Sequence, residues 1–349
     1  MRQRQFLVII ISIAFFLVFL RWQSSFSRHS GDLISSELNT LRRDLENERN
    51  FRIQSEQEIA RLKEQLQLES EKRTGLEDRL ESVAKQVQSS SAGVTKKGKT
   101  RFIFGIPSVY RREKNYLPET MRSLLSNLGE AYHSQVKFVI YNADTPPERH
   151  LALQQLRNDF KSEFDDGMIE VIANTEGYEE MRRPLNLTHG DSLERVKWRS
   201  KQVLDFAYLM EYCKDKADYY IHLEDDIVAA KNYLQRIDDW LRKNYESRSD
   251  WIILSFFNPW SIEDGGVYNP DSFSGFIGQL YRSSDLEEVI RFFKRRYNDS
   301  PADWLMKDYL KESSKKVFAK KPCLFQHIGV LSSLDGKTQG AKAIDFDDG

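Results

Sequence analysis

The sequence predicts an α/β domain preceded by a transmembrane helix and an α-helical coiled-coil stem. Three observations support this organisation: an apolar run at residues 6–20, a heptad repeat between residues 38 and 87, and alternating strand and helix patterns from residue 101 onward. All 9 prolines of the 349-residue chain stand at or after Pro107, where a domain with turns is expected and a long helix is not.

The composition excludes several classes of protein. The 52 Lys and Arg residues face 53 Asp and Glu residues, a net charge of −1, so we expect no nucleic-acid partner. A hydrophobic content of 40% excludes a wholly disordered chain. Two cysteines, Cys213 and Cys323, exclude a disulfide scaffold and a Cys-rich zinc module. They could form one disulfide in a lumenal compartment, which the sequence leaves open.

The N-terminal apolar run reads FLVIIISIAFFLVFL and is followed by Arg21 and Trp22. As a helix it covers roughly 22 Å at about 1.5 Å per residue. We predict a cytosolic tail at residues 1–5 and a signal-anchor at residues 6–22, with the rest of the chain in the lumen. A cleaved signal peptide is the alternative, but no small-x-small cleavage site follows the run.

The heptad repeat predicts a coiled-coil stem at residues 31–88. Positions spaced by three and four from Leu38 are mostly apolar, with polar interruptions at Glu48, Arg52, Ser55, Glu69 and Arg73. A parallel homodimer through this stem is the functional interpretation, and a single solvated helix is the alternative. Residues 89–100, SSSAGVTKKGKT, have the composition of a flexible linker.

Residues 101–340 form the predicted α/β domain, and residues 341–349 an acidic tail. Apolar runs predict strands at residues 101–106, 136–141, 168–173, 219–223 and 251–256. Helices are predicted after Pro118 and at residues 147–164, 194–212 and 232–245. In such a domain the functional loops follow the carboxyl ends of the strands. Glycine-rich nucleotide-binding motifs and the GxSxG elbow are missing from the sequence.

The sharpest chemical signal is Glu224-Asp225-Asp226, at the end of the apolar strand YYIHL. Three adjacent carboxylates repel one another unless a cation or a proton relieves them. Oxygen ligands suit Mg²⁺ or Mn²⁺, which can bridge to a diphosphate. The alternative is one aspartate that caps a turn beside two solvated acids.

Further candidates lie later in the chain. His327, in LFQHIG, is either a structural histidine or a metal ligand that would favour Mn²⁺. Asp303 follows Ser300 and Pro301, a pattern typical of a helix capping box. The alternative is that the Asp303 carboxylate acts as a general base. Gly275 and Gly278, which flank Phe276, permit close approach of a ligand or form a tight turn. Four side chains could meet a diphosphate, although solvated positions are the simpler interpretation: Arg111, Trp198, Arg199 and Lys201.

Several long strings resemble the alpha-1,3-mannosyl-glycoprotein 4-beta-N-acetylglucosaminyltransferase family. They are GIPSVYRREKNYL, WRSKQVLDFAYLM, YYIHLEDDIVAAKNYL, GFIGQLYRSSDL, PADWL and LFQHIGVLSSLDGK, spread over residues 101–340. The resemblance implies a GT-A (Rossmann-like) glycosyltransferase domain in a single-pass type II protein of the Golgi membrane. It implies transfer of N-acetylglucosamine from UDP-GlcNAc to a mannose of an N-glycan, with inversion and with a divalent cation, Mn²⁺.

The resemblance also assigns roles to individual residues. Asp226, Asp225 and His327 would bind the metal, and Asp303 would be the base. Glu224, Asp225, Pro107, Arg111 and Arg199 would contact the nucleotide sugar. Gly275, Phe276 and Gly278 would lie on the acceptor side.

The chain departs from the family in ending at Gly349, so we expect no lectin-like C-terminal domain and leave branch specificity open. Inactive members that bind and regulate other Golgi glycosyltransferases are the alternative function, and the presence of Asp303 favours an enzyme. Two sequons, at Asn186 and Asn298, could carry glycans, with Asn186 preferred because Asn298 stands close to Asp303.

Overall fold

The computed structural model describes residues 100–273, 275–330 and 340–347, together with scattered positions between residues 41 and 67. The chain divides into two units, Met1–Thr95 and Lys96–Gly349. The predicted tail and anchor (residues 1–22), nearly all of the linker and most of the stem lie outside the described residues. The described stem positions are helical, with Leu41 and Leu45 exposed in the single chain. Dimerisation through the stem stays a prediction.

The predicted Golgi membrane location does not agree with the structure. Among the described residues, no helix is both long enough and apolar enough to cross a membrane. This finding contradicts the localisation predicted from the N-terminal run, which itself lies outside the described part of the chain.

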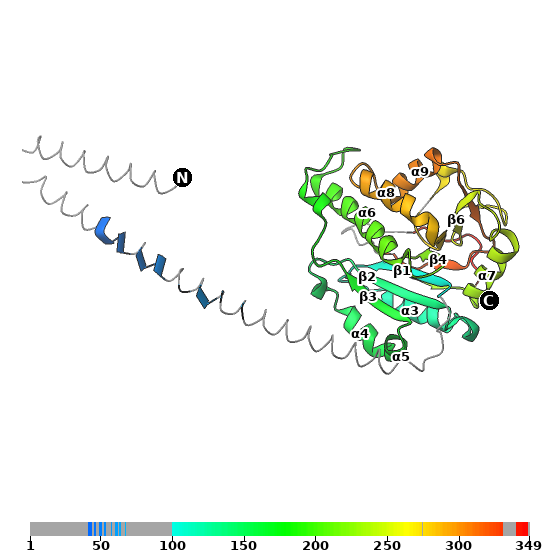
Figure 1. Ribbon diagram of the computed structural model, residues 1–349, viewed down its shortest axis with the longest axis horizontal. Helices are drawn as coiled ribbons and strands as arrows, with labels where there is room; N and C mark the ends of the chain where they lie inside the picture. Colours follow the sequence, from blue (N-terminus) through cyan, green and yellow to red (C-terminus); the bar gives the residue numbers. More distant parts are fainter. Residues whose placement is uncertain are drawn as a thin grey trace, which may run out of the picture. The chain divides into compact units, whose positions relative to one another are not determined.

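The second unit is built on one mixed sheet with the strand order β3-β2-β1-β4-β7-β6-β8 (Figure 1). Four neighbouring strands are parallel, as predicted for an α/β domain: β1 (Phe102–Ser108), β2 (Val136–Asn142), β3 (Ile169–Ala173) and β4 (Tyr219–His222). The other half contains β6 (Trp251–Ser255), β7 (Gln279–Arg282) and β8 (Lys316–Ala319), where β7 is antiparallel to both of its neighbours. A separate two-stranded sheet pairs β5 (Ile227–Ala229) with β9 (Phe325–His327).

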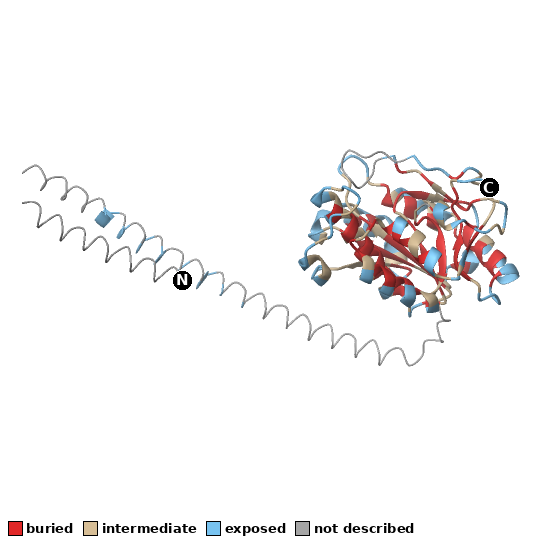
Figure 2. Cartoon of the chain, turned by 90° about the horizontal axis from the view of Figure 1, so that it is seen from above, coloured by how far each residue is buried: buried red, intermediate tan, exposed pale blue. Residues whose placement is uncertain are grey.

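Helices cover both faces of the large sheet, so the central strands are buried on each side (Figures 1 and 2). One apolar core lies against α3 (Leu117–Ser126), α4 (Ala152–Asp159) and α7 (Tyr233–Asn244). The other lies against α6 (Leu193–Cys213), α8 (Leu286–Arg296) and α9 (Ala302–Glu312). Burial on both faces explains why these strands read as continuous apolar runs.

The predicted strands at residues 101–106, 136–141, 168–173, 219–223 and 251–256 agree with β1, β2, β3, β4 and β6, apart from ends that differ by a residue or two. The predicted helix at residues 147–164 is wrong. It is broken into the 3₁₀ turn η3 (Pro147–Arg149), α4 and α5 (Lys161–Asp165). His150 ends η3 with ψ 72° and turns inward to 3% exposure, and Phe160 has non-helical angles between α4 and α5.

The two cysteines are free and buried. Cys213, at the end of α6, belongs to one core, and Cys323 belongs to the core on the opposite side of the sheet. The disulfide that the sequence left open is therefore not formed.

Candidate active site

The site lies at the carboxyl edge of the sheet, where the parallel strands β1, β2 and β4 end. Gly105 of β1 is in register with His222, the last residue of β4, and the Leu223 N–H donates to the Gly105 carbonyl at 3.0 Å. The chain after β4 therefore emerges beside the chain after β1. This pairing brings Glu224-Asp225-Asp226 close to Ser108 and Arg111.

The small β5-β9 sheet brings His327 to the carboxylates from a hundred residues further along the chain. Ile227 directly follows Asp226 and is in register with His327. The Ile328 N–H donates to the Asp226 carbonyl at 2.9 Å. As a result His327 Nε2 lies 3.3 Å from Asp226 Oδ2.

Glu224, Asp226 and His327 form a group suited to a divalent cation. Their candidate ligand atoms all lie within 4.8 Å of one another. Asp226 and His327 are 1% and 3% exposed, yet Asp226 Oδ1 and His327 Nε2 have no hydrogen-bond partner among the described residues. His327 Nδ1 lies 3.1 Å from the Ala341 carbonyl, an arrangement that leaves Nε2 available as a ligand. The donor set therefore fits a metal ion.

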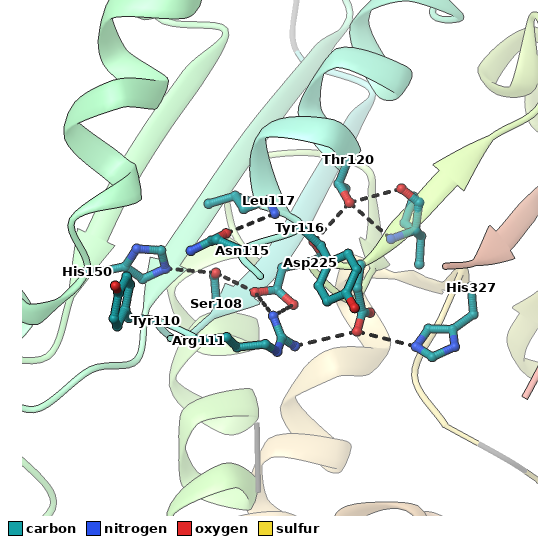
Figure 3. A network of polar contacts seen from close by, with 12 residues as sticks. Ser108, Tyr110, Arg111, Asn115, Tyr116, Leu117, Thr120, His150, Asp225 and His327 are labelled. Atoms are coloured by element: carbon teal, nitrogen blue, oxygen red, sulfur yellow. Dashed lines mark hydrogen bonds and ion pairs between the residues drawn. The ribbon is translucent and has the colours of Figure 1, made fainter. Parts of the chain in front are cut away.

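Asp225 lies outside that group and is held by Ser108 and Arg111 (Figure 3). The Ser108 hydroxyl donates to Asp225 Oδ2 at 2.5 Å, and Arg111 Nη1 lies 2.8 Å from Asp225 Oδ1. Arg111 Nη2 also reaches Asp226 Oδ2 at 3.5 Å. In this structure the predicted metal ligand Asp225 binds the arginine, and its neighbours Glu224 and Asp226 are the carboxylates grouped with His327.

The electrostatics of this edge reflect the crowding of like charges. Burial, together with the charge of Asp226, raises the pKa of Glu224 to about 7. Burial lowers the pKa of Arg111, but the charges of Asp225 and Asp226 outweigh this effect, and its pKa is raised overall. One positive side chain thus offsets part of the charge of the buried Asp225 and Asp226 and the half-buried Glu224.

Several residues of this network were missed by the sequence analysis. His150 Nε2 lies 2.9 Å from the Ser108 hydroxyl, and its buried Nδ1 has no partner within the described ranges. Thr120, on α3, donates its hydroxyl to the Asp225 and Ile227 carbonyls at 2.9 Å each. The Val330 N–H donates to the Tyr116 hydroxyl and so fixes the segment after His327. These contacts join residues far apart in the chain, and no local pattern reports them.

Gly329 is a further residue that the sequence analysis did not single out, although it stands in the quoted string LFQHIG. A Cβ atom at this position would lie 2.1 Å from Asp226 Oδ2 and 2.9 Å from His327 Nε2. Because such distances are far below van der Waals contact, only glycine fits here without moving the carboxylate or the imidazole.

The residues of the predicted acceptor-side segment, Gly275, Phe276 and Gly278, have different surroundings in the structure. Gly275 (φ +77°) brings the backbone against the site, because its Cβ position lies 3.5 Å from Glu224 Oε1, and the Phe276 backbone hydrogen-bonds to Glu224. The Phe276 side chain, 2% exposed, packs in the core against Phe206 and Phe293. Gly278 (φ +63°) packs against Phe325. Pro107 is half-buried near the end of β1.

Asp303 lies in the first turn of α9 and is partly exposed. The predicted capping box is not formed: the residue that caps α9 is Pro301, without a side-chain hydrogen bond. The Ser300 hydroxyl instead lies 2.9 Å from His189 Nε2. Asp303 makes no ion pair with any described residue, so its carboxylate is available for chemistry.

Arg199 is not placed for nucleotide binding in this structure. It is 0% exposed and donates to Asp191 at 3.1 Å, to the Asn298 carbonyl at 3.1 Å and to the Thr188 hydroxyl at 2.6 Å. Its contacts tie the loop before α6 to the segment before α9. Arg199 therefore supports the helix that carries Asp303 and does not face the carboxylates.

Helix α6 connects this supporting network to the carboxyl edge. Its C-terminal end leads into the start of β4, so its N-terminal end lies where the parallel strands finish. Lys201 Nζ donates at 2.6 Å to the carbonyl of Ala143, the residue after β2, and bonds Asp205 at 2.8 Å. The N-terminal turns of α6, and through Arg199 the start of α9, are thus held at the same edge as Asp225.

The two sequons differ in exposure. Asn186 is exposed in the loop before α6. Asn298 is 8% exposed, and its carbonyl accepts the Arg199 hydrogen bond. Because an attached glycan needs an accessible amide, the structure supports Asn186 alone as an acceptor.

Comparisons with known proteins agree with the resemblance seen in the sequence. A family model, the MGAT4 conserved region, matches residues 62–346. The alpha-1,3-mannosyl-glycoprotein 4-beta-N-acetylglucosaminyltransferase A of Rattus norvegicus is 35% identical over 272 residues, which are 73% of this chain and 47% of that protein. The corresponding B protein of Mus musculus is 35% identical over 260 residues, 70% of this chain and 44% of that protein. The chain spans about half the length of these relatives.

Among solved structures, a crystal structure of S. aureus TarS in complex with UDP-GlcNAc is 12% identical, with a TM-score of 0.39, and the match covers 64% of this chain and 57% of that one. A likeness at that level carries no argument about the site. The family model, in contrast, covers most of the chain, from the second half of the predicted stem to the segment after His327. The chain is therefore a member of the alpha-1,3-mannosyl-glycoprotein 4-beta-N-acetylglucosaminyltransferase (MGAT4) family.

Proposed function

We propose that this chain is a GT-A-type glycosyltransferase that transfers N-acetylglucosamine from UDP-GlcNAc to a mannose of an N-glycan, with inversion. Membership of the family supports the donor and the acceptor class. One structural observation carries the proposal: Asp226 Oδ1 and His327 Nε2 are buried beside Glu224 without a hydrogen-bond partner among the described residues, at the edge where parallel strands end. Unpartnered buried ligand atoms of this kind fit a cation that binds together with a diphosphate.

The donor side is formed by the carboxylates and Arg111. Glu224, Asp226 and His327 would hold a divalent cation, and Mn²⁺ fits their mixed oxygen and nitrogen donors. When bound, such an ion neutralises the charge of the departing diphosphate. Arg111 forms ion pairs with Asp225 and Asp226, so we assign it to orient the nucleotide sugar.

The acceptor side is formed by the start of α9. Asp303 would take the proton from the attacking mannose hydroxyl, whose oxygen then bonds to the anomeric carbon of the donor as the bond to UDP breaks. Attack from the face opposite the leaving group inverts the anomeric centre. The clamp around Arg199, built from Asp191, Thr188 and Asn298, would hold α9 in place during this step.

The test is turnover of UDP-GlcNAc by the full-length chain with Mn²⁺ and a mannose-containing N-glycan. Asp303→Asn should lower kcat by roughly 10²–10⁴-fold, because the amide cannot accept the proton, and should leave UDP binding unchanged. Asp308→Asn on the same helix is the matched control: it removes the negative charge from the 2.9 Å contact with Arg296 and should retain turnover. Wild-type kcat in Asp303→Asn would rule out this base. A wild-type chain without turnover that still binds glycosyltransferases would favour a regulatory member of the family.

A further inference from the structure

Trp304 is a large aromatic side chain left exposed directly beside Asp303. Its side chain is 46% exposed in the first turn of α9. Its indole N–H makes no hydrogen bond to any described residue. Trp304 thus presents an accessible aromatic surface at the residue that follows Asp303.

The direction of the Trp304 ring follows from helix geometry and from His189. Side chains on an α-helix tilt toward its N-terminus, so Trp304 leans over Ser300 and Pro301, the residues four and three positions before it. The His189 ring meets the Trp304 ring edge-on, with centroids 5.0 Å apart and planes at 79°. His189 Nε2 also lies 2.9 Å from the Ser300 hydroxyl and 3.1 Å from the Asp299 carbonyl. The indole is therefore held at the N-terminal end of α9.

His189 is itself fixed by the clamp around Arg199. It adopts φ +60°, an uncommon angle for a residue other than glycine. Its neighbour Thr188 donates to the Asp299 carbonyl at 2.6 Å and accepts from Arg199 at 2.6 Å. The Trp304 ring thus rests on a rigid support, and a ligand that stacks on it would not have to order the support first.

A pyranose ring fits this arrangement. One face of a sugar presents apolar C–H groups, which pack on an aromatic face, while its hydroxyls remain at the rim for hydrogen bonds. We infer that Trp304, braced by His189, is the platform on which the acceptor mannose stacks, so that one of its hydroxyls is presented to Asp303. The inference rests on the proposed function, since it assigns the acceptor subsite of that reaction.

Trp260 provides a matched control. It is 53% exposed, close to the value for Trp304, but its indole N–H donates to the Ser272 carbonyl at 3.0 Å in the loop between β6 and β7. It therefore differs from Trp304 in its polar contact and in its distance along the chain from Asp303, while the change to alanine removes the same side chain.

The experiment measures binding of a soluble mannose-terminated N-glycan to the full-length chain by calorimetry, with UDP and Mn²⁺ present. Trp304→Ala should weaken the glycan affinity about tenfold or more, the loss typical of truncating an aromatic anchor. Trp260→Ala should stay within about twofold of wild type. Trp304→Phe keeps an aromatic face and should restore most of the affinity. Trp304→Leu repeats the test if the alanine variant does not fold.

The outcomes separate this inference from the proposed function. Equal glycan affinity in wild type and Trp304→Ala overturns the platform, as does the absence of glycan binding by the wild type. Glycan binding that depends on Trp304 in a chain without turnover supports the platform and overturns the enzyme. Turnover by the wild type with an unchanged acceptor KM in Trp304→Ala supports the enzyme and overturns the platform.

Discussion

Arg111 and Arg199 are both surrounded by polar groups at the carboxyl edge of the sheet, but only one network is complete. Each of the three guanidinium nitrogens of Arg199 donates to a partner. Around Arg111 four buried atoms lack a hydrogen-bond partner within the part of the chain that the structure describes: its own Nε, His150 Nδ1, Asp226 Oδ1 and His327 Nε2.

The difference separates a polar network that stabilises the fold from one that can bind a ligand. A buried polar network in which every donor and acceptor is hydrogen-bonded is stable in the folded protein without a ligand. A network with unpartnered buried atoms carries a desolvation cost that a ligand can relieve. The Arg111 network is therefore where a cation and a nucleotide would bind, and the Arg199 network is the framework that holds α9, the helix that carries the proposed base Asp303.

The largest effect should come from removing the Arg199 guanidinium from the completely hydrogen-bonded network. Arg199→Met should lower the free energy of unfolding by about 3–5 kcal/mol, because Asp191 and the Thr188 hydroxyl lose their buried partner. Arg195→Met is the control: Arg195 bonds the same Asp191 at 2.8 Å but is 41% exposed, so its loss should cost less than about 1 kcal/mol. Urea unfolding measures both.

The Arg199→Met variant can also contradict the distinction between the Arg111 and Arg199 networks. If Arg199→Met keeps wild-type stability but no longer binds UDP, Arg199 belongs to the nucleotide site, as the sequence analysis expected. The support role would then be wrong.

A second prediction concerns crowding in the incomplete network. Gly329→Ala places a methyl group at a position 2.1 Å from Asp226 Oδ2, so the carboxylate must move, and Mn²⁺ affinity should fall by about 10–100-fold. Gly340→Ala is the control, because no atom of the described residues lies within 4 Å of its Cβ position. Calorimetric titration with Mn²⁺ measures the change, and wild-type affinity in Gly329→Ala would show that Asp226 is not a ligand.

The smallest effect is expected at Ser108. Ser108→Ala removes the hydrogen bonds to Asp225 and His150 and should lower the free energy of unfolding by about 1–2 kcal/mol. Because Asp225 keeps its contact with Arg111, UDP binding should weaken by only a few-fold. Ser126→Ala, which removes an exposed hydroxyl bonded to the Arg122 carbonyl, is the control. Loss of Mn²⁺ binding in Ser108→Ala would show that the Ser108 and Asp226 parts of the network are not separable.

The sequence was sufficient for the parts of this site that depend on local pattern. Buried strands read as apolar runs because helices cover both faces, and three acids after β4 stand out in an otherwise apolar segment. The sequence did not distinguish Arg111 from Arg199, because no local pattern around either residue reports the long-range contacts that complete the Arg199 network and leave the Arg111 network incomplete. The pairing of β5 with β9, which brings His327 to Asp226, likewise has no local signature.

The predicted helix at residues 147–164 failed for a related reason. The sequence of this segment is compatible with a helix, but His150 departs from the helical conformation and contacts Ser108, 42 positions earlier in the chain. Tertiary contacts to a polar network decided the local conformation, and helix propensity could not anticipate them.

The two free cysteines have a practical consequence. They lie in the two cores on opposite sides of the sheet, and burial raises the pKa of each thiol to about 12. Thiols that are buried and protonated react slowly with alkylating reagents while the domain is folded. The chain therefore carries one native chemical reporter in each layer, and the order in which Cys213 and Cys323 become labelled during unfolding would show which layer opens first.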